Sequence, residues 1–444
     1  MAISSETTLP TEAPREQAVL VGIEVKRERN PWSVEESLAE LAQLASTAEI
    51  DVVDHIYQKV ERIHPATLMG KGKLEELLEL IDGHEADAVI FDDELSPRQQ
   101  REIEERLEER FGERWQERPV KVLDRTTLIL DIFARHARTR EGALQVELAQ
   151  YQYRLPRLTR AWTHLVRQAG GAAGRGGTGG VGLRGPGETQ LEIDRRDINR
   201  RIDYLKRELE NVRTHRALHR QQRRKSGVPV VSLVGYTNAG KSTLLNTLSG
   251  ANVLTADMLF ATLDPTTRRV ELPNGTTALF TDTVGFIQKL PTTLVAAFRA
   301  TLEEITEADM ILHIVDITHP HVMNQVLTVE ETLAELDATG KPVITALNKI
   351  DRLENLAEVW SQLQEFPNSA AVSALTGQGI SELLARVEQV FLASMVSIDA
   401  VIPYSRGDLV ALIYEKGTVE RKDHVTEGTR IKGWVPPEIA VKLE

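Results

Sequence analysis

Apolar and polar positions follow two alternating periods over the first part of the chain. Runs such as AVLVGIEV and ADAVIFDD are apolar enough for buried strands, whereas SVEESLAELAQLAS repeats its apolar residues at helical spacing. A capping box of Ser33 and Glu36 is predicted to start that helix. Because single helices separate the strands, residues 17–124 are predicted to form an α/β domain with a parallel sheet, after a disordered stretch at 1–16.

The strand pattern stops near residue 125, and helical periodicity replaces it over residues 125–227. Two apolar stripes step by four and three positions, as in coiled coils. They predict an antiparallel helical hairpin whose first arm is interrupted at Pro156 and whose second arm spans about 188–225. The stripes consist of Leu144, Leu148, Tyr151, Leu155 and Leu158 in the first arm and Ile198, Ile202, Leu205, Leu209 and Val212 in the second.

Strands and helices alternate again over residues 228–395, which predicts a second α/β domain. Residues 396–444 show a strand, a helix and two short strands, and are expected to form a small α/β appendage. A chain of 444 residues is too long for one hydrophobic core, so an α/β protein of several domains is expected.

The composition excludes several classes of protein. Apolar residues make up 41% of the chain, and no apolar run approaches the roughly 20 residues that a membrane helix needs. The first residues are polar and acidic, unlike a signal or transit peptide. The absence of cysteine excludes disulfides, iron–sulfur clusters and thiolate zinc sites. We therefore expect a cytoplasmic protein without a membrane span. A monomer is also expected, although the composition does not decide the oligomeric state.

Charge is distributed unevenly along the chain. The net charge is −13, yet residues 151–225 hold 18 Arg and Lys against 7 Asp and Glu, a local charge of +11 that leaves −24 on the remainder. Such segregation is typical of an element that binds a polyanion. A solvated helix face would explain the same charges.

The loop between the two helical arms has an unusual composition. Ten of the eighteen residues in 170–187 are glycine, and from 151 to 187 every charged side chain is arginine. Glycine allows close approach of the backbone to phosphates or bases, and arginine contacts phosphate or stacks on a base. We expect Arg167, Arg175 and Arg184 to contact RNA, although a flexible linker would also fit the glycine content.

The segment VPVVSLVGYTNAGKSTLLNTL predicts a buried strand, a phosphate-binding loop and a helix. Backbone amides and the helix N-terminus of such a loop bind phosphates. Lys241 is expected to reach the β- and γ-phosphates, and the Ser242 hydroxyl to hold Mg²⁺. The motif alone occurs by chance in on the order of one chain in a hundred, so it needs support from other motifs.

Two further segments supply groups for the phosphates and the metal ion. The strand in FTDTVG ends at Asp282, whose carboxylate is expected to hold Mg²⁺ directly or through water, and the Gly285 amide is expected to sense the γ-phosphate. In LFATLDPTTRR, Thr262 is expected to complete the coordination of Mg²⁺ when the γ-phosphate is present. Catalytic roles are expected for Lys241, Thr262 and Gly285.

The base-recognition motif follows a third strand as Asn-Lys-Ile-Asp at 348–351. The Asp351 carboxylate can accept hydrogen bonds from guanine N1–H and the 2-amino group, which adenine lacks, so it selects guanine. Lys349 is expected to cover the base plane, and an amide within 373–375 to meet guanine O6. Four strand-terminal motifs in this order predict a GTPase.

With these motifs the chain resembles the HflX family of translation-factor-related GTPases. The resemblance rests on GYTNAGKSTLLN, LFATLDPTTRR, DTVGFI and NKID, and outside that domain on RIHPATLMGKGKLEEL and GGVGLRGPGETQLEIDRR. It covers essentially the whole chain and implies binding to the large ribosomal subunit and splitting of stalled ribosomes under stress. It assigns nucleotide binding to Gly235, Tyr236, Thr237, Asn238, Ala239, Gly240, Lys241, Ser242, Phe260, Ala261, Thr262, Leu263, Asp264, Asp282, Thr283, Val284, Gly285, Asn348, Lys349, Ile350, Asp351, Ser373, Ala374 and Leu375.

Phe286 occupies the position where many GTPases carry a glutamine that orients the attacking water. An apolar residue there predicts slow hydrolysis by the protein alone. The ribosome would supply the missing group, or Asn238 would help to bind K⁺ beside the phosphates. Asn238 also fits a plain turn residue.

Three other functions fit parts of the sequence. In the first, the GTPase would act as an assembly checkpoint on immature large subunits. In the second, the hairpin would be a scaffold for a protein partner. The third is an ATP-dependent RNA-remodelling module in the N-terminal domain, where MGKGK at 69–73 would form a phosphate-binding turn. That segment lacks the spacing of a P-loop, and its lysines also fit a solvated surface.

Overall fold

The computed structural model describes residues 15–26, 31–158, 186–226, 228–251, 258–291, 302–353, 366 and 368–443. Its contacts divide the chain into two compact units. The first unit comprises Met1–Arg135 and Tyr153–Arg196, and the second comprises His136–Gln152 and Asp197–Glu444. No helix within the described ranges is long and apolar enough to cross a membrane.

The first unit contains a four-stranded sheet in which all neighbouring strands are parallel. All four residues of its inner strand β3 are buried, as expected for a parallel sheet covered on both faces. The α/β fold predicted from the alternation of strands and helices is confirmed. The strands lie in the order β2 (Ile50–Val60), β1 (Glu16–Val25), β3 (Ala88–Phe91) and β4 (Lys121–Asp124).

The described helices that accompany this sheet are α1 (Val34–Thr47), α2 (Lys71–Gly83), α3 (Pro97–Phe111), α4 (Glu113–Glu117) and α5 (Arg125–His136). The predicted capping box at the start of α1 is confirmed, because the Glu36 amide donates to Ser33 Oγ and the Ser33 amide donates to Glu36 Oε2. A Cβ on Gly22 of β1 would lie 2.7 Å from Val34 Cγ2. Glycine at this position therefore allows α1 to pack closely on the sheet.

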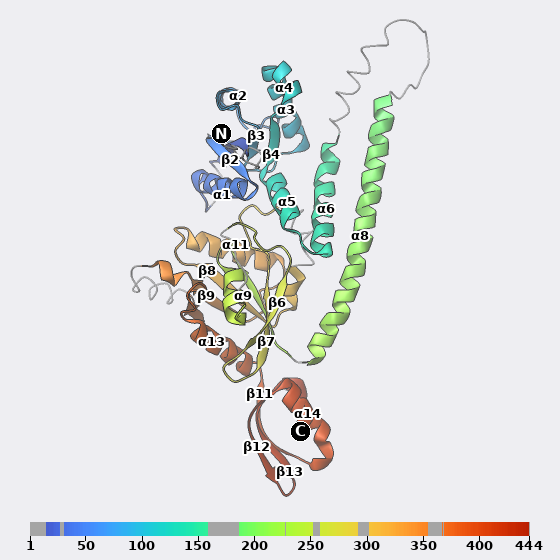
Figure 1. Ribbon diagram of the computed structural model, residues 1–444, viewed down its shortest axis with the longest axis vertical. Helices are drawn as coiled ribbons and strands as arrows, with labels where there is room; N and C mark the ends of the chain where they lie inside the picture. Colours follow the sequence, from blue (N-terminus) through green and yellow to red (C-terminus); the bar gives the residue numbers. More distant parts are fainter. Residues whose placement is uncertain are drawn as a thin grey trace, which may run out of the picture. The chain divides into compact units, whose positions relative to one another are not determined.

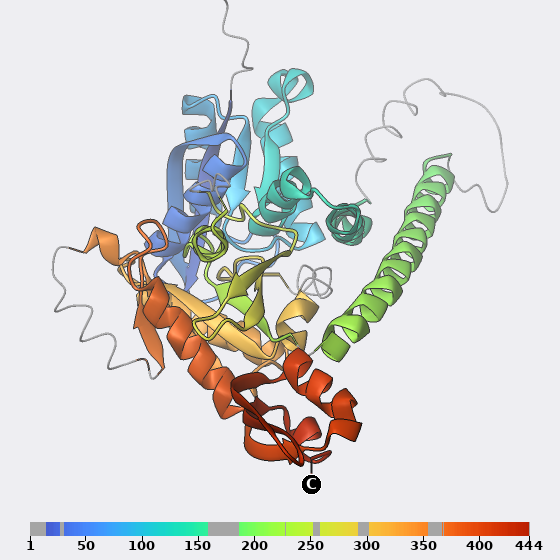
Figure 2. The same ribbon diagram turned by 60° about the horizontal axis from the view of Figure 1, so that its bottom comes forward.

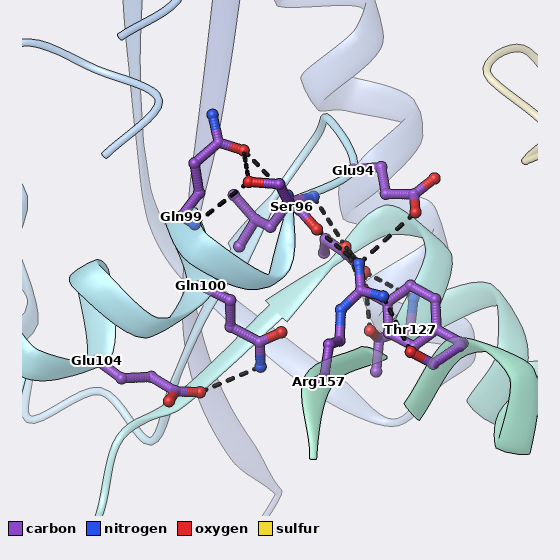
Figure 3. A network of polar contacts seen from close by, with 10 residues as sticks. Glu94, Ser96, Gln99, Gln100, Glu104, Thr127 and Arg157 are labelled. Atoms are coloured by element: carbon purple, nitrogen blue, oxygen red, sulfur yellow. Dashed lines mark hydrogen bonds and ion pairs between the residues drawn. The ribbon is translucent and has the colours of Figure 1, made fainter. Parts of the chain in front are cut away.

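The end of helix α6 (Arg140–Arg154) and the turn η1 (Leu155–Arg157) are anchored within the first unit (Figure 3). The Arg157 guanidinium donates to the Leu95 carbonyl oxygen at 2.5 Å and lies 3.4 Å from the Tyr153 ring centroid. The Tyr153 hydroxyl donates to Asp124, which also accepts from the Leu95 amide at 3.0 Å. Burial and the neighbouring Asp124 charge raise the pKa of Tyr153. The helix ends before Pro156, as its position in the sequence predicts.

Helix α8 (Pro186–Ser226) is a single helix of 41 residues (Figure 1), about 60 Å long at the usual rise. Ion pairs join Arg140 to Glu208 and Glu147 to Arg201, so later residues of α8 meet earlier residues of α6. This pairing confirms the expected antiparallel arrangement. Ile202 and Leu205 of the predicted stripe are buried in α8. In the first arm, Leu148 is buried, whereas Leu144 and Tyr151 of α6 and Leu155 of η1 are half-buried.

The second unit contains a six-stranded sheet in which only β6, at one edge, is antiparallel. Apolar residues alternate between its faces: one set packs with α9 (Lys241–Ser249) and α13 (Ile380–Ala393), and the other packs with α11 (Val322–Glu335). This is the expected P-loop GTPase architecture. The strands lie in the order β10 (Ser369–Ala371), β9 (Val343–Asn348), β8 (Met310–Asp316), β5 (Val230–Gly235), β7 (Thr277–Asp282) and β6 (Thr266–Glu271).

The C-terminal part follows the predicted order of strand, helix and two strands. Helix α14 (Gly407–Lys416) covers an antiparallel sheet of β11 (Val396–Ile402), β13 (Gly428–Val435) and β12 (Thr418–Val425), as Figure 2 shows. Its core is small and aliphatic, and includes Ile413 and Ile431, both fully buried.

Helix α5 packs with the first unit, although the sequence pattern places it in the second predicted domain. Ile129, Ile132 and Phe133 are fully buried, and the contact pattern assigns the chain through Arg135 to the first unit. The sequence interpretation ended that domain at residue 124, and its domain borders stay predictions.

Candidate nucleotide site

The loop between β5 and α9 depends on two glycines. A Cβ on Gly235 would lie 2.3 Å from the Ile314 carbonyl oxygen, and one on Gly240, whose φ is +96°, would lie 2.3 Å from Asn348 Nδ2. Only glycine permits both approaches. Asn238 adopts a φ of 61°, a left-handed conformation that asparagine tolerates, as expected of a turn residue.

The Lys241 side chain lies inside this loop. Its ammonium group donates to the carbonyl oxygens of Gly235 at 3.1 Å and Tyr236 at 2.9 Å, and the residue is only 6% exposed. Burial lowers the pKa of Lys241 to about 8, and the charge of Asp282 opposes this shift. A buried cation within a ring of backbone groups is well placed to bind an anion.

Ser242, Thr262 and Asp282 converge beside the start of α9. The Ser242 Oγ atom lies 2.7 Å from Thr262 Oγ1 and donates to Asp282 Oδ2 at 2.7 Å. Burial raises the pKa of Asp282 above its usual value, although the charge of Lys241 opposes this shift. Among the described residues, none donates a hydrogen bond to the buried Asp282 Oδ1 atom. Two hydroxyls and a carboxylate with an open oxygen fit the all-oxygen coordination that Mg²⁺ prefers.

The residues after β7 lie against the phosphate-binding loop. A Cβ on Gly285 would lie 2.8 Å from Thr237 Cα and 3.0 Å from Lys241 Nζ. The Phe286 amide donates to the Gly235 carbonyl oxygen at 3.1 Å, and its own carbonyl accepts from the Thr237 amide at 2.7 Å. The Phe286 side chain is 1% exposed. Position 286 therefore joins the two loops through its backbone, while its side chain packs in the interior.

Asn348 connects the base-recognition motif to two other loops. Its Nδ2 group donates to the Ala239 carbonyl oxygen at 2.8 Å, and its Oδ1 atom accepts from the Ala374 amide at 2.9 Å. Ser373 Oγ donates to Asp351 Oδ1 at 2.5 Å, and Lys349 Nζ lies 2.7 Å from Asp316 Oδ2. The four motifs predicted from the sequence thus meet at the carboxyl ends of parallel strands, where open α/β sheets bind ligands.

Loop 260–264 has partners that the sequence did not reveal. The Phe260 amide donates to Thr237 Oγ1 at 3.0 Å, and both Phe260 and Leu263 are buried. The Asp264 carboxylate accepts from the backbone amides of Arg138 and Thr139, both at 2.8 Å. The family resemblance assigns Asp264 to the nucleotide, and this stays a prediction; the structure shows its carboxylate bound to the start of α6. These partners lie 125 and 126 positions away in the chain, beyond any local sequence pattern.

The MGKGK segment of the first unit is occupied by contacts within the protein. The Gly70 amide at the start of α2 donates to Gln58 Oε1 at 3.0 Å, and Lys73 pairs with Glu76 at 2.9 Å. These contacts take up groups that a phosphate-binding turn would present, so they do not favour an ATP site here. The three arginines predicted to contact RNA, Arg167, Arg175 and Arg184, lie outside the described residues.

A buried phosphate-loop lysine, a magnesium-type set of oxygens and an Asn-Lys-x-Asp motif at one sheet edge define the class of P-loop GTPases. Comparisons with known proteins agree. Family models match as "GTP-binding GTPase N-terminal" at residues 35–134, "GTP-binding GTPase Middle Region" at 136–223, "50S ribosome-binding GTPase" at 230–349 and "HflX C-terminal domain" at 358–432. The chain belongs to the HflX family of ribosome-associated GTPases, and it is a GTPase.

Curated relatives support this assignment over nearly the full chain. GTPase HflX of Lacrimispora saccharolytica is 44% identical over 428 residues, covering 96% of this chain and 95% of the relative. GTPase HflX of Escherichia coli is 42% identical over 408 residues, covering 92% of this chain and 90% of the relative. A solved GTP-binding protein of Sulfolobus solfataricus in complex with GDP aligns with 84% of this chain and 98% of its own, at 23% identity and a TM-score of 0.41.

Proposed function

We propose that this GTPase, in its GTP-bound form, binds the large ribosomal subunit and splits stalled or stress-arrested ribosomes. The observation that carries the proposal is the match to GTPase HflX relatives over 96% of the chain, together with a family model described as a 50S ribosome-binding GTPase. The match includes the residues on both sides of the glycine-rich segment 170–187, which suits contact with ribosomal RNA.

The proposed nucleotide site assigns a role to each of the convergent groups. The Lys241 ammonium and the loop amides would bind the β- and γ-phosphates, and the Gly285 amide would contact the γ-phosphate. Ser242 and Thr262 would coordinate Mg²⁺, with Asp282 bound to it directly or through water; the ion would neutralise charge on the phosphates. Asp351 would accept from the guanine base. The remaining predicted nucleotide residues belong to the same loops, and we expect them to contact the nucleotide too.

Hydrolysis would be slow without the ribosome. The buried Phe286 side chain offers no polar group to orient water, and groups supplied by a partner raise GTPase rates by roughly 10³ to 10⁵ in other systems. We propose that the large subunit supplies or orders this group. A K⁺ ion near Asn238 is a second candidate, and replacing K⁺ by Na⁺ in the assay tests it.

The working cycle couples nucleotide state to ribosome binding. GTP would order the loops that contain Thr262 and Gly285, and the ordered protein would bind through its basic helical hairpin. Binding would strain contacts between the subunits, and hydrolysis would release the factor. On this scheme splitting needs GTP binding, whereas hydrolysis serves recycling.

Sedimentation with purified mature large subunits tests the proposed partner. We expect the protein to sediment with them in a non-hydrolysable GTP analogue and not in GDP, and we expect the subunits to raise its GTPase rate. Preference for precursor particles over mature subunits would favour the assembly checkpoint instead. Binding to naked ribosomal RNA that weakens steeply with salt would separate RNA contact from protein contact.

A further inference from the structure

Loop 260–264 is tied to the start of helix α6 by three hydrogen bonds. Asp264 Oδ2 accepts from the Arg138 and Thr139 amides, both at 2.8 Å, and Asp264 Oδ1 accepts from the Thr139 hydroxyl. The Thr139 hydroxyl also accepts from the Gly142 amide at 3.0 Å. Thr139 is thus the N-cap of α6 and at the same time the donor that holds Asp264. All these residues lie in the second unit.

Gly142 makes this approach possible. A Cβ at position 142 would lie 2.4 Å from Asp264 Oδ1 and 3.3 Å from Thr139 Oγ1. Contacts of 2.4 Å do not occur between such atoms, so any larger residue at 142 must displace the Asp264 carboxylate. The glycine lies inside the first turn of a helix, where alanine would be the better helix former. Glycine at position 142 therefore allows the close approach of Asp264, at the cost of a weaker helix former.

The start of α6 is itself held by ion pairs in the same unit. Glu141, which is buried, pairs with Arg216 of α8 at 2.8 Å, and Arg216 also lies 3.9 Å from Glu304. Arg213, one turn earlier in α8, lies 3.7 Å from Glu303. Residues 302–307 form a helix of the nucleotide-binding domain. The first turn of α6 is therefore a fixed point to which a loop of the nucleotide site can attach.

Thr262 lies two residues before Asp264, and its hydroxyl lies 2.7 Å from Ser242 Oγ. We propose that Thr139 and Gly142 are positioning residues for GTP hydrolysis: by holding Asp264, they keep loop 260–264 in the conformation that presents Thr262 to the Mg²⁺ and γ-phosphate side of the site. This inference rests on the role proposed for Thr262. It assigns part of the hydrolytic apparatus to the middle region, outside the nucleotide-binding domain.

The coupling works in both directions. If the contact with α6 favours the Thr262 position that binds GTP, then GTP binding must favour the contact by the same factor. Loss of the γ-phosphate removes the ligand that Thr262 would serve, and this weakens the hold on the helix start. The Asp264–Thr139 contact is thus the place where the nucleotide state reaches the helical hairpin.

Equilibrium binding of fluorescent GDP and of a non-hydrolysable GTP analogue, titrated with Mg²⁺, tests the proposal in the full-length protein. We compare Thr139→Val, which removes the hydroxyl, and Gly142→Ala, which displaces Asp264 while favouring the helix, with Thr139→Ser as the matched control. We expect both variants to weaken binding of the analogue about tenfold and to need more Mg²⁺, with GDP affinity unchanged. Thr139→Ser should behave as the parent protein does.

Thr262→Ala separates the two levels of the argument. If it weakens analogue binding while Thr139→Val and Gly142→Ala do not, the positioning role is wrong and the role of Thr262 stands. If Thr262→Ala also leaves analogue binding and Mg²⁺ dependence unchanged, both are wrong. If the contact only stabilises the fold, each variant should weaken binding of GDP and of the analogue equally. If the contact has no effect on the site, Gly142→Ala should leave the binding of both nucleotides unchanged. Either pattern overturns the proposal.

Discussion

At the scale of single residues, position 286 shows how the backbone and the side chain of one residue serve different purposes. The backbone of Phe286 joins Gly235 and Thr237, so it links the two loops nearest the proposed γ-phosphate site. Its side chain is 1% exposed and contributes to the core. The polar group that many GTPases place here cannot be restored by exchanging the side chain, because the local packing directs that side chain inward.

Phe286→Gln is therefore expected not to raise the GTPase rate of the protein alone. The substitution places a side-chain amide in an apolar position, and a buried amide that lacks hydrogen bonds costs about 1–3 kcal/mol of stability. Single-turnover hydrolysis and thermal unfolding measure both effects, with Phe286→Leu as the control for packing. A rate more than tenfold above that of the parent protein would contradict this account.

Local sequence patterns identify some groups of the candidate site and miss some of its contacts, for a physical reason. The phosphate-binding loop and the Asn-Lys-Ile-Asp motif involve residues adjacent in the chain, so a local pattern identifies them. The contact of Asp264 with Thr139 joins positions 125 residues apart, and it depends on packing that no periodicity encodes. The assignment of Asp264 to the nucleotide stays a prediction, and the structure adds a protein partner for its carboxylate that no local pattern indicates.

At the scale of elements, burial explains which strands and helices the pattern finds. Strands β3 and β5 are apolar runs and were expected, because both faces of a parallel sheet are covered. Strand β6 was missed: it lies at the sheet edge, and only Val270 of its six residues is buried, so it shows no apolar alternation. Its polar character is typical of edge strands.

Helix α5 carries a buried charge that the sequence pattern does not predict. Arg125 is 1% exposed; its Nη2 group donates to Asp92 Oδ1 at 2.6 Å, and its Nη1 group donates to Glu40 Oε1 at 2.7 Å. Burial alone would lower the pKa of Arg125, but Asp92 and Glu40 raise it above the usual value. The Asp92 side chain is also 1% exposed, so water has little access to either charged group of this pair.

Arg125→Met should destabilise the first unit by about 3–5 kcal/mol, because it removes the buried cation that pairs with Asp92 and Glu40. Amide hydrogen exchange of β3 in the full-length protein measures the loss. The matched control is Arg135→Met on the same helix, since Arg135 is 44% exposed in its ion pairs and should contribute less than about 1 kcal/mol. Equal effects of the two variants would contradict the importance assigned to burial.

At the scale of the whole molecule, the local charge of +11 that the sequence places at 151–225 is partly used within the protein. Arg157 binds the Leu95 carbonyl, Arg201 pairs with Glu147, and Arg216 pairs with Glu141. These contacts show that part of the positive charge of the hairpin is bound to groups within the protein. The RNA contact expected of Arg167, Arg175 and Arg184 stays a prediction, because these residues lie outside the described ranges.

Deleting residues 170–187 is expected to abolish ribosome splitting while GTP affinity stays within about twofold of the parent protein, since the segment contributes no predicted nucleotide residue. Arg175→Ala combined with Arg184→Ala should weaken ribosome binding and its salt dependence. The matched control replaces both arginines by lysine, which keeps the charge but not the planar group. A deletion variant that still splits ribosomes would exclude this segment from the mechanism.

The most direct test of the central claim is the light scattered by intact ribosomes after mixing with this protein in GTP, a non-hydrolysable GTP analogue, GDP or ATP. We expect scattering to fall with GTP and with the analogue, and to stay constant with GDP and ATP, because splitting requires the GTP-bound conformation and not hydrolysis. A fall with GTP alone would show that hydrolysis drives the reaction. Constant scattering in all four nucleotides would contradict the splitting function and leave a ribosome-associated GTPase with another task.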